Sequence, residues 1–211
     1  MYLSRVELDL GKRKTLQALA VPNLFHGAVE SSFQEEERAR NLWRIDRIGG
    51  RWYLLIQSPQ VPDLSQLVHQ FGKEPFDPSK ATKNYDHYLD RIETGQVMRF
   101  RLTANPTTSV SCKGQDRGKI MAHITPEYQK KWLVGKQEAC GFRLDENDFD
   151  VSEKQWYHFR KKAGMEVTLL AVSFEGVLKV EDAEIFRKTL ISGIGREKAY
   201  GMGLMTVISV Q

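Results

Sequence analysis

The 211-residue chain has only two cysteines and no long apolar run. Cys112 and Cys140 lie far apart without Cys-x-x-Cys spacing, which argues against a disulfide scaffold and a zinc ribbon. No apolar stretch approaches the ~20 residues of a membrane-spanning helix, and the charged N-terminal segment lacks the apolar core of a signal peptide. We therefore expect a soluble, cytoplasmic protein with no membrane partner.

Several signatures of enzyme chemistry are also missing. There is no His-Glu-x-x-His, no Gly-x-Ser-x-Gly and no paired-cysteine metal set. Residues 114–120 resemble a phosphate-binding loop but are one residue short, with Ile120 in place of the metal-binding hydroxyl. The acidic run 145–150 has Phe149 where a calcium ligand is required. The sequence therefore predicts no metal site and no cofactor.

The first half of the chain shows the pattern of one small α+β domain. Apolar residues alternate in strands and recur at helical spacing in two helices, and Gly49-Gly50 supplies the turn of a hairpin. The order is β-α-β-β-α-β, which is the ferredoxin-like arrangement. The expected elements are a strand at 2–10, a helix at 22–36, a hairpin of 41–48 and 51–57, a helix at 64–71 capped by Asp63, and a strand at 97–104.

The second half repeats this order more loosely, so we predict two tandem ferredoxin-like domains. Residues 1–108 form the first domain and 109–118 a basic linker. Residues 119–211 form the second domain, with an inserted hairpin or loop at 141–162. The expected elements there are strands at 119–124, 165–174 and 176–180, a helix at 125–139, a helix at 182–191 capped by Asp182, and a closing strand at 204–210.

Positive charge is in slight excess, with 31 Lys and Arg against 27 Asp and Glu, a net charge of +4. This balance mildly favours an anionic partner but also occurs in proteins without one. Four glycines stand in the segment 193–203, together with Arg196 and Lys198. Such a segment can approach a phosphate backbone closely, although a tight loop packing a helix on a strand explains it equally well. Lys113, Arg117 and Lys119 suit phosphate contacts or a solvated linker.

Two further segments carry candidate residues. The aromatic-basic run 156–162, with Arg160 and Lys161, is suited to stacking on bases and binding phosphates, or to a packed edge strand. His26 opens the first predicted helix at the edge of its apolar stripe, where packing can hold a side chain that faces a groove. From the residues alone, an uninvolved histidine at a helix start is the simpler interpretation.

Four segments together resemble one family, the CRISPR repeat-processing endoribonucleases of type I-E Cascade, called CasE. They are Met1–Val6, similar to the first strand of that family; Phe100–Pro106, similar to its mid-chain strand; Phe174–Leu178, similar to a late strand; and the glycine-rich Gly193–Leu204. They span nearly the whole chain in order. The resemblance implies two ferredoxin-like domains, which agrees with the independent prediction from the pattern.

The resemblance further implies metal-independent cleavage of the repeat RNA at the base of its hairpin, after which the enzyme stays on the mature guide RNA in Cascade. The catalytic histidine of the family corresponds to His26. Family members can carry a Tyr three residues earlier, where this chain has Asn23. The implied partners are the CRISPR RNA hairpin and other Cascade subunits, with no small-molecule substrate. Cations expected on the RNA backbone are Arg99, Arg101, Lys113, Arg117, Lys119, Arg160, Lys161, Arg196 and Lys198.

Two other functions stay open at this point. Asn23 is the feature that favours the first of them, a Cascade subunit that binds the guide-RNA hairpin without cutting it. A ferredoxin-like domain that does not bind RNA is the third alternative, and it predicts no affinity for any structured RNA.

Overall fold

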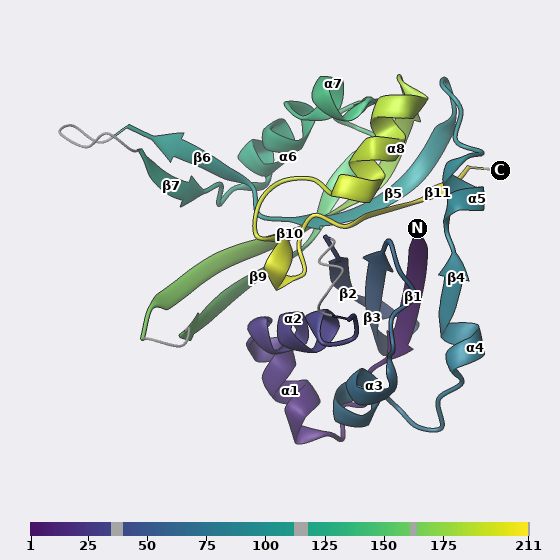
Figure 1. Ribbon diagram of the computed structural model, residues 1–211. Helices are drawn as coiled ribbons and strands as arrows, with labels where there is room; N and C mark the ends of the chain where they lie inside the picture. The colour runs from purple at the N-terminus through teal and green to yellow at the C-terminus, as the bar shows by residue number, and fades with distance from the viewer. Residues whose placement is uncertain (35–39, 112–117, 161–163, 211) are drawn as a thin grey trace.

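Four antiparallel strands form the first sheet, in the order β2-β3-β1-β4. The computed structural model describes residues 1–34, 40–111, 118–160 and 164–210 (Figure 1). The predicted hairpin is confirmed, with its turn at Gly49-Gly50 in positive-φ conformations. The strands are β1 (Tyr2–Glu7), β2 (Leu42–Ile48), β3 (Arg51–Ser58) and β4 (Thr82–Asn84).

Helices cover one face of this sheet (Figure 1). They bury a core of apolar side chains that includes Val6, Phe25, Leu67 and Phe71. The helices are α1 (Arg13–Ala20), α2 (Asn23–Glu30) and α3 (Ser65–Phe71), with the short α4 (Pro78–Ala81) and α5 (Asp86–Leu89) following.

The helix predicted over 22–36 is present but shorter, because α2 ends at Glu30. A separate helix that the sequence pattern did not predict, α1, precedes it. Helix α1 begins within the basic cluster at 12–14. Lys12, just before it, joins this region to α3, because its ammonium donates to the backbone carbonyls of Val68 and His69, 3.1 Å away in each case.

The strand Val97–Ala104 (β5) lies in a different sheet from the one predicted. It pairs with β10 and β11, whereas β4 is the fourth strand of the first sheet. The placement of the strand at 97–104 in the first sheet is therefore wrong. The alternation of apolar and polar residues along β5 indicates a half-buried strand, but it does not indicate which sheet the strand joins.

The second sheet has the order β11-β5-β10-β8, and β9 also pairs with β10. Residues 149–160, predicted as part of an inserted hairpin or loop, form one arm of a long antiparallel ribbon with β10 (Figure 1). The strands beside β5 are β8 (Phe142–Arg143), β9 (Phe149–Arg160), β10 (Glu166–Val180) and β11 (Met205–Ser209).

Helices cover one face of the second sheet also, around a core that includes Phe100, Phe174 and Phe186. The predicted cap at Asp182 is confirmed, because its carboxylate accepts the backbone N–H of Ile185 at 2.9 Å. The helices are α6 (Pro126–Val134), α7 (Gln137–Cys140) and α8 (Ala183–Ser192), and a short 3₁₀ turn, η1 (Lys198–Tyr200), precedes β11.

A separate two-stranded hairpin is formed by β6 (Thr107–Val110), which includes the first two residues of the predicted linker, and β7 (Lys119–Ala122). Residues 112–117 of that linker lie outside the described residues. The hairpin projects from the same side of the molecule as the β9–β10 ribbon but apart from it (Figure 1). Residues 119–124 were therefore wrongly predicted as a strand of the second sheet.

When β9 is left out, each sheet has four strands in chain order, with the fourth beside the first and the third between the first and the second. That order, with the connecting helices, is the ferredoxin-like fold, so the predicted α+β class with two tandem copies is confirmed. Within the described ranges, none of the helices has the length and apolarity needed to cross a bilayer.

Candidate active-site groove

His26 lies on α2, the helix that faces the second domain. Phe25, Ala28 and Val29 point into the first core, because their spacing puts them on one side of the helix. His26 falls on the flank of that stripe, and 35% of its side chain is exposed. The helix therefore holds the imidazole in place while leaving it open to solvent.

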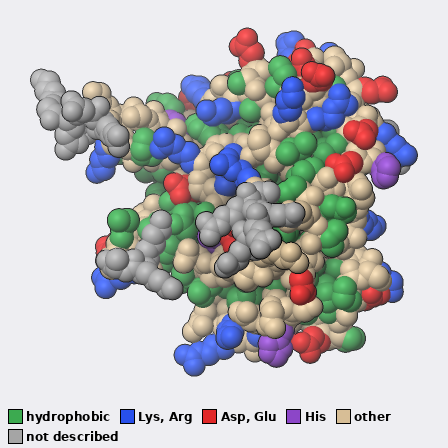
Figure 2. Space-filling view, viewed as in Figure 1, with side chains coloured by type: hydrophobic (Ala, Val, Ile, Leu, Met, Phe, Trp, Pro, Cys, Tyr) green, Lys and Arg blue, Asp and Glu red, His purple; other side chains and the backbone are tan. Residues whose placement is uncertain are grey.

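A groove of about 590 Å³ separates His26 from the glycine-rich segment of the second domain. Helix α2 packs against η1, so a helix of the first domain and a loop of the second form its two walls. Lys and Arg side chains border the junction of the two domains on this face (Figure 2). The groove is lined by His26, Glu30, Arg40, Asn41, Gly195, Arg196, Glu197, Lys198 and Ala199.

Glycines give the glycine-rich segment its shape. Its two ends are joined where the Ile194 N–H donates to the Gly203 carbonyl at 2.9 Å, so the residues between form a closed loop. Gly201 has φ +78°, which an L side chain rarely adopts. Arg196 and Lys198 are carried on this loop toward α2. The two interpretations of this segment therefore coexist, because the loop packs tightly and also lines the groove.

Charges of both signs face the groove. The His26 Nδ1 atom is 4.0 Å from Oε1 of Glu30, one helical turn away. Arg40 and Arg196 have no ion-pair partner within the described ranges. The Lys198 ammonium donates to the Ser192 carbonyl at 2.8 Å. Burial lowers the pKa of Lys198 from its ordinary value, and repulsion from Arg40 lowers it further.

Sequence reasoning missed three residues of the groove: Glu30, Arg40 and Asn41. The i,i+4 spacing from His26 to Glu30 was available as a signal. Arg40 and Asn41 carry no such signal, since only the folded path of the chain brings the start of β2 to α2. The Asn41 Oδ1 atom is buried and has no hydrogen-bond partner within the described ranges.

The other predicted RNA-binding residues lie away from this groove. Arg99 is exposed on β5, Lys119 is exposed on β7, and Arg160 near the end of β9 pairs with Glu166 at 2.7 Å. Arg101 is 3.4 Å from Asp46 and 3.3 Å from Glu175, which places it in an ion network between the domains. Lys113, Arg117 and Lys161 lie outside the described residues.

That ion network is built around Arg44 on β2, which is 1% exposed. Its guanidinium holds both carboxylate oxygens of Asp46, at 2.7 and 2.8 Å. It also donates to the backbone carbonyls of Arg101 and Leu204 and to the hydroxyl of Thr206, each at 2.8 Å. All five guanidinium N–H groups are satisfied, and three of these bonds reach the second domain. We call Arg44, Asp46 and Arg101 the domain clasp.

No group of three or more His, Cys, Asp or Glu side chains in the described part of the chain is placed to hold a metal ion.

The fold and groove define a protein of two ferredoxin-like domains with a histidine and cations facing one another across their junction. The chain belongs to the family described as CRISPR associated protein, whose model matches residues 1–209. It is 32% identical to the CRISPR-associated endoribonuclease Cse3 of Thermus thermophilus, over 98% of this chain and 99% of that protein. The sequence resemblance to CasE is confirmed: identity to the CRISPR system Cascade subunit CasE of Escherichia coli is 25%, over 80% of this chain and 92% of that one.

Solved structures agree with this assignment. A structure of the Thermus thermophilus Cse3 bound to an RNA representing a pre-cleavage complex matches with a TM-score of 0.80 at 30% identity, covering 98% of each chain. The Escherichia coli protein Cas6e matches over the full length of both chains with a TM-score of 0.63 at 23% identity, which supports the fold.

Proposed function

We propose that this chain is an endoribonuclease that cuts CRISPR precursor RNA at the repeat hairpin and stays bound to the product as a Cascade subunit. The observation that carries the proposal is the groove, in which a partly exposed histidine has Arg40 on its own side and faces Arg196 and Lys198 across the domain junction. The full-length similarity to a protein named as a CRISPR-associated endoribonuclease supports the same function. We propose that the protein acts in the cytoplasm.

The proposed reaction uses the RNA's own nucleophile. The 2′-hydroxyl oxygen attacks the adjacent phosphorus in line, and the bond from phosphorus to the 5′-oxygen breaks. The products are a 2′,3′-cyclic phosphate and a 5′-hydroxyl. One proton leaves the 2′-oxygen and one reaches the 5′-oxygen, so the protein must transfer protons and neutralise charge on the phosphate, and the scheme needs no metal.

The residues of the groove match these two tasks. An imidazole exchanges protons near neutral pH, and His26 serves as the base on the 2′-hydroxyl or the acid on the 5′-oxygen. Arg40, Arg196 and Lys198 offer positive charge where the phosphate accumulates negative charge. The Oε1 atom of Glu30 lies 4.0 Å from Nδ1 of His26, so this carboxylate is placed to orient the imidazole ring.

Binding of the hairpin outside the groove rests on exposed cations. Arg99 and Lys119 are exposed on β5 and β7, and we propose that they contact the RNA backbone. Shape and phosphate contacts dominate recognition of A-form RNA, because its major groove is too narrow for side chains to read. We propose the same role for Arg160, Lys161, Lys113 and Arg117.

A second candidate function is hairpin binding without cleavage. It is favoured by Asn23, which stands at the first position of α2, one helical turn before His26. An amide cannot exchange a proton as a phenol does, so this position adds no second acid or base.

One assay separates the two functions. A repeat-hairpin RNA is incubated with the protein in EDTA, beside the same RNA with a 2′-deoxy sugar at the cut site. We expect the first RNA to be cut and the second to be bound but left intact. Tight binding of both without cutting would support the binding subunit, and no binding of either would contradict both functions.

A further inference from the structure

Trp43 of β2 lies between the two walls of the groove. The residue is 2% exposed. On one side its ring packs against Phe25, with centroids 5.9 Å apart and planes tilted by 58°. Phe25 directly precedes His26 on α2, so the position of the imidazole depends on how this aromatic pair packs.

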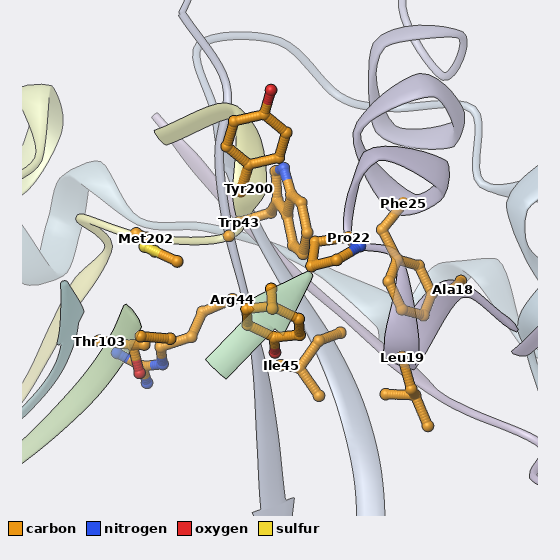
Figure 3. Close-up of a pocket in the computed structure, with 13 residues that line it drawn as sticks. Ala18, Leu19, Pro22, Phe25, Trp43, Arg44, Ile45, Thr103, Tyr200 and Met202 are labelled. Carbon is orange, nitrogen blue, oxygen red and sulfur yellow. The ribbon is translucent and has the colours of Figure 1, made fainter. Parts of the chain in front are cut away.

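On its other side the indole meets the glycine-rich segment. A Cβ atom built on Gly201 would lie 2.5 Å from Cζ3 of Trp43 and 2.9 Å from Cε3 and Cη2. The backbone at Gly201 therefore rests directly on the six-membered part of the indole, and no larger residue fits without a shift. Figure 3 shows Trp43 between Phe25 and Pro22 on one side and Tyr200 and Met202 on the other.

The two neighbours of Trp43 hold the same segment at its ends. Leu42 packs against Gly193, because a Cβ atom built on this glycine would lie 2.9 Å from Cδ1 of Leu42. Arg44 donates to the carbonyl of Leu204, just after the last glycine. Three consecutive residues of β2 therefore contact the loop that carries Arg196 and Lys198, one at its first glycine and two near its end.

We propose that Trp43 is a positioning residue for RNA cleavage: it sets the distance between His26 on α2 and the cations of the glycine-rich segment. This inference rests on the proposed function. Packed interiors transmit a change of side-chain volume to their neighbours, and in-line attack at phosphorus tolerates little misplacement of the catalytic group. The Trp43 Nε1–H has no hydrogen-bond partner within the described ranges, so the size of the ring, rather than a polar contact, accounts for its place.

The test uses Trp43→Phe, Gly201→Ala and the double variant. The smaller ring lets the two walls approach, and the added methyl pushes them apart, so each single variant should cut the repeat hairpin about 10- to 100-fold more slowly at saturating protein. The dissociation constant for the uncleavable 2′-deoxy RNA should stay within about threefold. The alanine is also strained at φ +78°, but both variants that carry it share this strain. The double variant should therefore cut faster than Gly201→Ala alone, because Trp43→Phe removes the ring atoms that the methyl meets.

Phe142→Leu is the matched control, because Phe142 is 1% exposed in the second core and packs against Phe186 rather than against either wall. It should lose similar thermal stability and keep its cleavage rate. Phe25→Leu tests the contact from the other side if Trp43→Phe does not fold. Three results would overturn this inference without affecting the proposed function. They are cleavage slowed equally in Phe142→Leu, RNA affinity lost in parallel with rate in Trp43→Phe, and cleavage by Trp43→Phe at the wild-type rate. A wild-type chain that binds RNA and never cuts it overturns the proposed function as well.

Discussion

Two charged regions lie at the same domain junction, and their charges are arranged in opposite ways. In the domain clasp, Arg44 and Asp46 are almost wholly buried and every guanidinium N–H of Arg44 is satisfied within the protein. In the groove, Arg40 and Arg196 have no ion-pair partner within the described ranges, and His26 is partly exposed.

The contrast separates charge that holds the fold from charge that is available to a ligand. A buried cation without its partner is costly, so the clasp must be complete in the free protein. An exposed cation is solvated at little cost and can exchange water for phosphate. The number of Lys and Arg residues does not distinguish these cases, but their partners do.

Removing the imidazole should produce the largest effect. We expect His26→Ala to lose about 10²–10⁴ in cleavage rate, because acid–base catalysis typically contributes that factor. Its affinity for 2′-deoxy hairpin RNA and its melting temperature should stay near wild type. Single-turnover cleavage measures the rate. A rate unchanged in this variant would remove His26 from the mechanism.

Breaking the clasp should act on stability instead. We expect Asp46→Ala to lower the free energy of unfolding by about 3–5 kcal/mol, because it leaves the Arg44 guanidinium buried without a counter-charge. Urea denaturation measures this. Glu184→Ala, which removes an exposed pair with Lys188, should cost less than about 1 kcal/mol. Similar losses in the two variants would contradict the distinction.

Two arginines sharpen the comparison directly. Arg196→Ala should reduce the salt dependence of RNA binding by about one unit of log K against log salt, with stability unchanged. Arg101→Ala should leave that slope unchanged and lower stability, since its partners are Asp46 and Glu175. Fluorescence titrations over a series of KCl concentrations give both slopes. A lower salt slope in Arg101→Ala, with stability unchanged, would show that Arg101 contacts RNA instead of holding the domains together.

The smallest effect should come from titrating Lys198. Because burial and Arg40 lower its pKa, Lys198 loses its proton at a lower pH than an ordinary lysine. Its contribution to phosphate binding therefore weakens at a lower pH than that of an ordinary lysine. We expect a few-fold loss of RNA affinity as the pH is raised toward the ordinary lysine pKa, and a smaller loss in Lys198→Arg, which stays charged. Equal losses in the two proteins would exclude Lys198 as the source.

Sequence patterns predicted the elements whose formation depends on residues close together in the chain. The hairpin around Gly49-Gly50 and the helix capped by Asp182 depend on turn and cap chemistry between near neighbours, and both are confirmed. The three-residue β4 is too short to show alternation, so nothing in the pattern marks it. Its place in the sheet comes from pairing with β1, about eighty residues away in the chain.

The site shows the same division. The position of His26 at the edge of an apolar helical stripe, and the presence of Arg196 and Lys198 in a glycine-rich loop, are readable along the chain. That these residues face one another, with Arg40 beside them, depends on packing across the domain junction around Trp43 and Gly201. The exposure of an arginine likewise follows from its partners, as Arg101 shows.

The sequence by itself determined the α+β class, the repeated ferredoxin-like order and the helix that presents His26, because each depends on periodicity and on residues close in the chain. Only the tertiary structure decided which sheet β5 joins, which cations face His26 and which are bound within the protein. Strand alternation and side-chain charge are properties of single segments, whereas pairing and ion-pair formation depend on segments that folding brings together from distant parts of the chain.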